Sequence, residues 1–128
     1  MSKVAWKEEP DEHDYPAAAS YLALLADADT VAALVEDLRS APLERHKAKD
    51  LLRASGLPDL PADNVHVAKD LARAKSGRAL SPVLLVRGDL SRGIHLQIAD
   101  GYHRVCASYH LDEDTDIPCR AVALPAAR

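Results

Sequence analysis

The stretch Gln97–Ala107, which reads QIADGYHRVCA, contains a change from strand to helix that decides the fold of this chain. Its apolar, strand-like beginning stops at Gly101, and a helix is expected to start at Tyr102. Glycine lets a backbone approach a ligand closely, and the first turn of a helix presents N–H groups that have no partner inside the helix. His103 and Arg104 add side-chain donors at the same place. The turn therefore predicts a site for a phosphate group.

The same turn also has a purely structural interpretation. Asp100 belongs to the residue types that cap helices by accepting hydrogen bonds from the first N–H groups, and an Asp-Gly pair is a common turn. The motif alone leaves both interpretations open, an anion site and a capped surface helix.

Two further strands are expected beside this turn. Val83–Val86 is a continuous aliphatic run of strand length, typical of a central strand that is buried on both faces. In Ile94–Ala99 apolar and polar residues alternate, as they do in a half-buried strand. The new helix is expected to run to about His110, and a last strand from Ile117 to about Val122.

Four helices are predicted upstream, at about residues 14–25, 30–41, 43–55 and 67–76. Asp14 is expected to cap the first helix, and Gly56 the C-terminal end of the third. Residues 1–13 are polar and acidic and are predicted to form a loose arm, which Trp6 pins to the surface.

The predicted fold is α+β, a small mixed sheet with flanking helices, preceded by an N-terminal helical extension. The chain has 128 residues, enough for a single domain over 1–128 with an aliphatic core and no disulfide. Within it, 14–57 is the expected helical part. Cys106 and Cys119 lack the spacing of a metal site and are expected to pack as small apolar residues.

The charge balance narrows the classes of partner. A net charge of −4 argues against binding of nucleic acid through bulk charge. No apolar run approaches the ~20 residues of a membrane helix, and the first residues lack the apolar core of a signal peptide. We therefore expect a cytoplasmic protein that contacts no membrane.

Three segments, SGRALSPVLLVRGD, IADGYHRVCASY and DIPCRAV, resemble the ParB/sulfiredoxin-like superfamily of the ParB-like nuclease domain type, over about residues 61–123. In that superfamily a turn of this kind lies beneath a nucleotide. The resemblance implies that Gly101, His103 and Arg104 bind the phosphates of ATP or another nucleotide. Tyr102 is expected to stack on the base or to close the pocket.

The helix before the central strand carries two more positions of the resemblance. Lys69 looks like the lysine that approaches the same phosphates in sulfiredoxins, and Ser76 matches a polar position of the family. The position between them is Ala72, which cannot donate a hydrogen bond. We expect Lys69 and the His103-Arg104 turn to meet at one anion-binding pocket.

Departures from the family restrict the expected activity. Sulfiredoxins have a cysteine directly before the His-Arg pair, where this chain has Tyr102, so repair of peroxiredoxins is not expected. ParB proteins bind CTP with a related turn and carry a DNA-binding region, for which this chain leaves no room downstream. Free serine kinases have an Asp-Gly-His-His-Arg turn and need a carboxylate base, for which Asp100, Asp63 and Asp70 are the candidates.

The sequence thus predicts a domain that binds nucleoside di- or triphosphates, with Mg²⁺ shared between phosphates and a carboxylate, and leaves phosphoryl transfer or hydrolysis open. Asp100 is a weak candidate for a catalytic role, and no residues are assigned as ligands of a resident metal. The alternative is a non-catalytic interaction module or a regulatory module related to DNA partition. In that case the N-terminal helices would dock a protein partner or a second copy.

Overall fold

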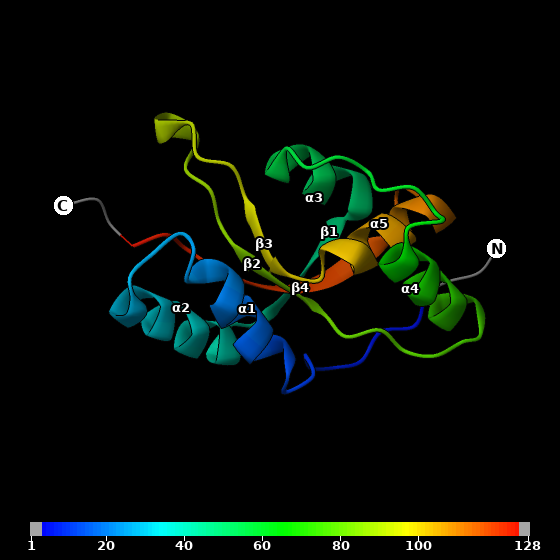
Figure 1. Ribbon diagram of the computed structural model, residues 1–128, viewed down its shortest axis with the longest axis horizontal. Coiled ribbons are helices and arrows are strands. Elements are labelled where there is room, and N and C mark those ends of the chain that lie inside the picture. Colours follow the sequence, from blue (N-terminus) through cyan, green and yellow to red (C-terminus); the bar gives the residue numbers. More distant parts are fainter. Residues whose placement is uncertain (1–3, 126–128) are drawn as a thin grey trace.

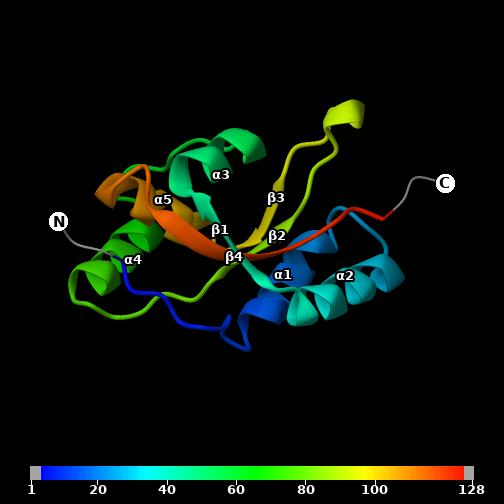
Figure 2. The same cartoon turned by 180° about the vertical axis from the view of Figure 1, so that it is seen from behind.

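The computed structural model describes residues 4–125, which form one mixed sheet between two layers of helices (Figures 1 and 2). The elements in chain order are α1 (Asp14–Leu22), α2 (Ala28–Ser40), β1 (Leu43–Lys47), α3 (Ala48–Ser55), α4 (Val65–Lys75), β2 (Val83–Val86), the short 3₁₀ helix η1 (Leu90–Arg92), β3 (Gln97–Asp100), α5 (Tyr102–Leu111) and β4 (Asp116–Val122). The fold is α+β with a helical N-terminal part, as the sequence predicted. Within the described residues, no helix combines the length and the apolar character needed to cross a membrane.

The sheet has four strands in the order β1-β4-β2-β3. β2 runs parallel to β4, whereas β1 pairs antiparallel with β4 and β3 pairs antiparallel with β2. All four residues of β2 are buried, which confirms the prediction of a central strand. Such a strand is apolar on both faces because helices cover both.

Alternation along β2 divides the core between the two faces of the sheet. Val83 and Leu85 pack with buried residues of α3, α4 and α5. Leu84 and Val86 pack with α1 and α2 on the opposite face. Figures 1 and 2 show the two helical layers on either side of the strands. This is a three-layer arrangement in which each helix buries one apolar face against the sheet.

One predicted helix is wrong in its first half. Leu43–Lys47 forms β1, and only Ala48–Ser55 is helical. All five residues of β1 pair in register with β4, from Leu43 opposite Arg120 to Lys47 opposite Asp116. Pairing with a strand far along the chain therefore overrides the local preference of these residues. Gly56 ends α3 in the left-handed conformation, as predicted.

The first helices differ from the prediction at their ends. His13 takes the N-cap position of α1, and Asp14 is the first helical residue. The helix ends at Leu22, so that Leu25 lies in the following turn and is exposed. α2 begins at Ala28, because Asp27 caps it by accepting a hydrogen bond from the N–H of Thr30.

The start of β3 and the N-terminal segment also differ from the prediction. β3 starts at Gln97, and Ile94 joins only an isolated bridge to Asp89. The N-terminal segment is not a loose arm from residue 5 onward, because Lys7 donates its N–H to the Leu80 carbonyl at 2.8 Å. Trp6 forms a parallel bridge with Leu80 and packs on the core, so its role as an anchor is confirmed.

Both cysteines are buried and free, as expected for small apolar residues. Burial raises the pKa of the Cys119 thiol to about 12, so this side chain stays protonated at neutral pH.

Replacement of Leu38 by alanine should lower the free energy of unfolding by about 2–5 kcal/mol, because this fully buried side chain of α2 would leave a cavity against the sheet. Val65→Ala is the control, since Val65 is 76% exposed on α4 and its loss should change stability by at most ~0.5 kcal/mol. Urea unfolding followed by circular dichroism measures both. Equal effects of the two substitutions would contradict the packing of α2 on this sheet.

Candidate functional site

The start of α5 is built around Gly101. This residue is the N-cap and has a φ of 109°, a conformation that side chains with a Cβ rarely adopt. A Cβ at Gly101 would lie 2.8 Å from Cγ2 of Val83 and 2.7 Å from Nη2 of Arg104. Only glycine therefore lets β3 turn directly into α5. No side chain among the described residues caps the first N–H groups of this helix.

Arg104 folds back over Gly101 and joins three parts of the structure. Its Nη2 donates to Oδ2 of Asp100 at 2.8 Å, and its Nη1 donates to the hydroxyl of Ser81. Nη1 also lies 3.6 Å from Oδ2 of Asp14. The side chain is only 14% exposed. The guanidinium thus ties α5, the end of β3, the segment before β2 and the start of α1 together.

The two carboxylates beside Arg104 are themselves buried or half-buried. Asp14 accepts hydrogen bonds from the Ser81 hydroxyl at 2.7 Å and from the N–H of Asp11 at 3.1 Å. Burial raises the pKa of the Asp100 carboxyl, Arg104 acts in the opposite direction, and Asp14 raises it again. Two carboxylates therefore share one arginine in a place that is largely removed from water.

α4 contributes a third carboxylate. The Asp70 side chain is 12% exposed, and Arg73, one turn further on, holds its Nη1 3.7 Å away. Burial raises the pKa of Asp70, although Arg104 and Arg73 oppose the shift. A carboxyl group kept in a cleft at a raised pKa is a common feature of functional sites.

His103 lies on the first turn of α5, and the centre of its ring is 4.8 Å from that of His66 on α4. Burial lowers the pKa of His103, and the neighbouring His66 lowers it further. His103 is therefore mostly neutral at pH 7 and has one nitrogen that can accept a proton.

Two adjoining cavities open at this place. The first, named here the acidic cavity, has a volume of about 240 Å³ and is lined by His13, Asp14, Ala17, Asp70, Asp100, Gly101, His103 and Arg104. The second, the basic cavity, has a volume of about 250 Å³ and is lined by Lys7, Asp11, His13, Arg73, Arg78, Ala79, Leu80, Ser81 and Arg104. They share His13 and Arg104, so together they form one cleft with two charge environments.

The structure brings five of the sequence-predicted residues to this cleft, namely Asp70, Asp100, Gly101, His103 and Arg104. Asp100 does not cap α5 as the structural interpretation supposed, because its carboxylate receives the guanidinium of Arg104.

The other predicted site residues lie outside the lining of both cavities as described. Tyr102 donates its hydroxyl to the carbonyl of Pro58 and packs on the core. Ser76 ends α4 and donates to the carbonyl of Arg73. Lys69 is exposed on α4. In its place α4 presents Asp70 and Arg73 to the cleft.

Sequence reasoning missed most of the groups that complete the cleft. The sequence predicts Asp14 as a helix cap, whereas in the structure Asp14 lies beside Arg104. No local pattern points to His13, Arg73 or Arg78. Asp70 was among the candidate carboxylates, whereas the third of them, Asp63, lies exposed in the loop before α4. The missed residues come together only through contacts between distant segments.

A group of three residues in the described structure could hold a metal ion. Asp11, His13 and Asp14 each offer a ligand atom, and these atoms lie within 4.8 Å of one another. Oδ1 of Asp11 already accepts a hydrogen bond from Lys7 at 2.7 Å. A metal ion here would therefore compete with an ammonium group, and its binding would be strengthened by phosphate oxygens from a ligand.

Comparisons of the chain with protein-family models, curated proteins and solved structures find no match.

Arg104→Ala should lower the free energy of unfolding by about 3 kcal/mol, because it leaves the buried Asp14 and the half-buried Asp100 without their cation. Arg53→Ala is a matched control, since Arg53 is exposed on α3. Thermal and urea unfolding compare the two. An Arg104→Ala protein as stable as the control would mean that the guanidinium does not hold the cleft together.

Asp70→Asn should raise the melting temperature at neutral pH. The pKa of Asp70 is higher in the folded protein than the ordinary value of 3.8, so folding binds this proton more tightly. As pH rises from about 3.8 through the raised pKa, the stability that the protonated Asp70 gives the folded protein is lost. Below about pH 3 the carboxyl group is protonated in both states, so the substitution should have no effect there. Asp63→Asn, on an exposed loop residue, is the control. A lower melting temperature at neutral pH would contradict the assignment.

Proposed function

We propose that the cleft binds the phosphates of a nucleoside di- or triphosphate together with a divalent cation. The observation that carries the proposal is the pairing of the basic cavity with the uncapped start of α5. Four cations, Lys7, Arg73, Arg78 and Arg104, line a cavity large enough for phosphate groups. The first turn of α5 adds backbone donors and the positive end of its dipole.

The four cations differ in how closely each is already paired with a group of the protein. Lys7 is paired with Asp11, and Arg104 is held by Asp100 and Ser81. Arg73 reaches Asp70 only at 3.7 Å, and Arg78 lines the basic cavity beside it. Arg73 and Arg78 are thus the arginines best placed to form new charge-assisted hydrogen bonds to phosphate.

The acidic cavity favours a phosphate that arrives with a metal ion. Asp14, Asp70 and Asp100 would repel a bare anion, whereas carboxylates are the ligands that Mg²⁺ prefers beside substrate phosphates. Mg²⁺ would neutralise part of the phosphate charge when bound. The neighbouring Asp11, His13 and Asp14 offer further ligand atoms for such an ion.

Phosphoryl transfer or hydrolysis is an extension of the proposal. A base for a hydroxyl group or water has to face the cleft without being occupied by another side chain. Asp100 is bound to Arg104 at 2.8 Å, whereas the closest ion-pair contact of Asp70 in the described structure is the 3.7 Å approach of Arg73. Asp70 is therefore the stronger candidate for the base, and Asp100 the weaker.

The resemblance of the Asp-Gly-Tyr-His-Arg turn to ParB/sulfiredoxin-like domains supports the same ligand class. The phosphate contacts from α4 would differ from those of the family. In this chain Arg73, in place of Lys69, would be the cation of α4 that faces the phosphates. Tyr102, whose hydroxyl donates to the carbonyl of Pro58, would take no part in the phosphate contacts.

Titration calorimetry with ATP, ADP, CTP and GTP, with and without Mg²⁺, tests the proposal. At least one nucleotide should bind saturably, more tightly with Mg²⁺. Arg73→Ala combined with Arg78→Ala should weaken binding at least tenfold, because each arginine loses charge-assisted hydrogen bonds worth about 1.5–3 kcal/mol. Arg53→Ala, outside the cleft, should bind as the original chain does.

Two outcomes would overturn this function. One is the absence of binding by a folded protein at millimolar nucleotide. The other is binding that the two substitutions in the basic cavity leave unchanged.

A further inference from the structure

Three aromatic rings follow one another at the start of α5. The centre of the His103 ring lies 4.8 Å from that of His66 on α4 and 5.6 Å from that of Tyr102. The planes of the two histidine rings are tilted by 44°. His103 also lines the acidic cavity. The row of rings therefore begins at the wall of the cleft and continues onto α4.

The three rings differ in how open they are to a ligand. Tyr102 packs on the core, and its hydroxyl donates to the carbonyl of Pro58. His103 is half-buried, whereas His66 is exposed. A flat ligand can therefore reach the ring of His66 more easily than that of Tyr102.

α4 places His66 in line with the charged groups of the cleft. His66, Asp70 and Arg73 stand at positions i, i+4 and i+7 of this helix, so they share one face. Asp70 lines the acidic cavity, and Arg73 lines the basic cavity. The step from His66 to Arg73 spans about 10 Å along the helix axis. One face of α4, which lies beside α5 in Figure 1, thus leads from an aromatic ring to a basic cavity.

The order of these groups matches the order of groups in a nucleotide. A base has a flat π face that stacks on aromatic side chains, histidine included. The phosphates carry the charge that arginines bind. The sugar separates the base from the phosphates, and the acidic cavity of about 240 Å³ lies beside Asp70, in the middle of the row. A nucleotide that uses both ends of the row has to lie along α4.

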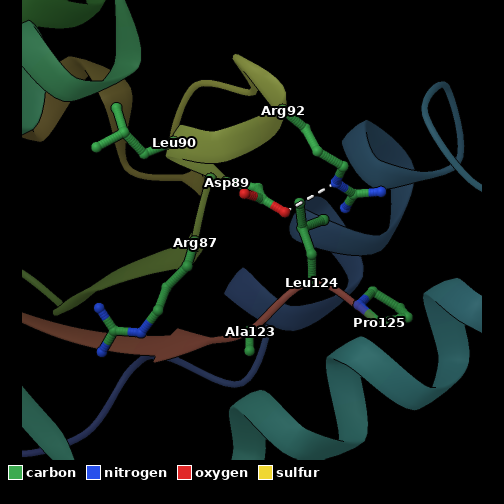
Figure 3. A pocket seen from close by; sticks show the side chains of 8 residues that line it. Arg87, Asp89, Leu90, Arg92, Ala123, Leu124 and Pro125 are labelled. Atoms are coloured by element: carbon green, nitrogen blue, oxygen red, sulfur yellow. Dashed lines mark hydrogen bonds and ion pairs between the residues drawn. The ribbon is translucent and has the colours of Figure 1, made fainter. Parts of the chain in front are cut away.

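A groove at the β2–β3 hairpin also contains arginines but lacks this combination (Figure 3). Nε of Arg92 donates to Asp89 at 2.8 Å, and Nη2 of Arg87 donates to Glu44 at 2.7 Å. Both arginines are thus paired with carboxylates of the protein. Among the described residues, those that line this groove include no aromatic ring. The hairpin groove therefore serves as a control region.

We propose that a nucleotide lies along α4, with its base stacked on His66 and its outer phosphates at Arg73 and Arg78. The inference rests on the proposed function and adds recognition of the base to that of the phosphates. His66 takes the stacking role that the sequence suggested for Tyr102. Stacking tolerates every base, because each base has a π face. The cleft therefore selects nucleotides over inorganic polyphosphates and has little preference among bases.

Titration calorimetry of the full chain with ATP and with inorganic tripolyphosphate, each with Mg²⁺, tests the assignment. The original chain should bind ATP more tightly than tripolyphosphate. His66→Ala should weaken ATP binding about tenfold and leave tripolyphosphate binding unchanged, because only ATP has a base to stack. His66→Phe should keep the affinity for ATP, since phenylalanine retains a stacking face.

Two control variants lie outside the row. His95→Ala removes an exposed histidine from the segment before β3, and Arg92→Ala removes an arginine from the hairpin groove. Neither should change the binding of ATP. Circular dichroism shows whether each variant is folded.

The role of His66 and the proposed function fail in different ways. If ATP binds and His66→Ala leaves its affinity unchanged, or weakens ATP and tripolyphosphate equally, the role of His66 is overturned and the phosphate site stands. If another nucleotide binds and ATP does not, the stacking of any base is overturned as well. A folded chain that binds no nucleotide overturns both the proposed function and this inference.

Discussion

The contact of Arg104 with two carboxylates is the constraint on which the rest of the site depends. One guanidinium meets Asp100 at the end of β3, Ser81 before β2 and Asp14 at the start of α1. It crosses the sheet layer and joins helices that pack on opposite faces. Since Arg104 lies directly over Gly101, the backbone of the turn and the charge cluster fix each other. Removal of either partner would leave a dehydrated charge behind.

The parts of the fold that were predictable are those that a local pattern determines. The apolar run of β2 and the glycine before α5 are visible in the sequence, because burial and backbone conformation restrict the residue types directly. β1 was not predictable, since its strand state comes from pairing with β4. The same limit applies to the cleft. Asp14 meets Arg104 only because α1 packs on the sheet, and no spacing in the chain encodes that contact.

The cleft retains charge at a cost in stability. Burial raises the pKa of Asp70 and of Asp100, so their ionised forms are disfavoured in the folded state. Apolar residues of similar size would be expected to make this region more stable. The presence of three carboxylates around one arginine therefore suits a site in which a ligand, rather than the protein, completes the charge balance.

The charged edge strand β1 has a consequence for assembly. Exposed strand edges have free backbone groups that recruit strands from other chains, and charged side chains on the edge discourage such pairing. β1 reads Leu-Glu-Arg-His-Lys, and Glu44 is held by Arg87 across the neighbouring strand. The other edge, β3, is crossed by α1, where Tyr21 donates to Gln97. Both margins of the sheet are thus protected against fibril-like growth, and association is left to helices and loops.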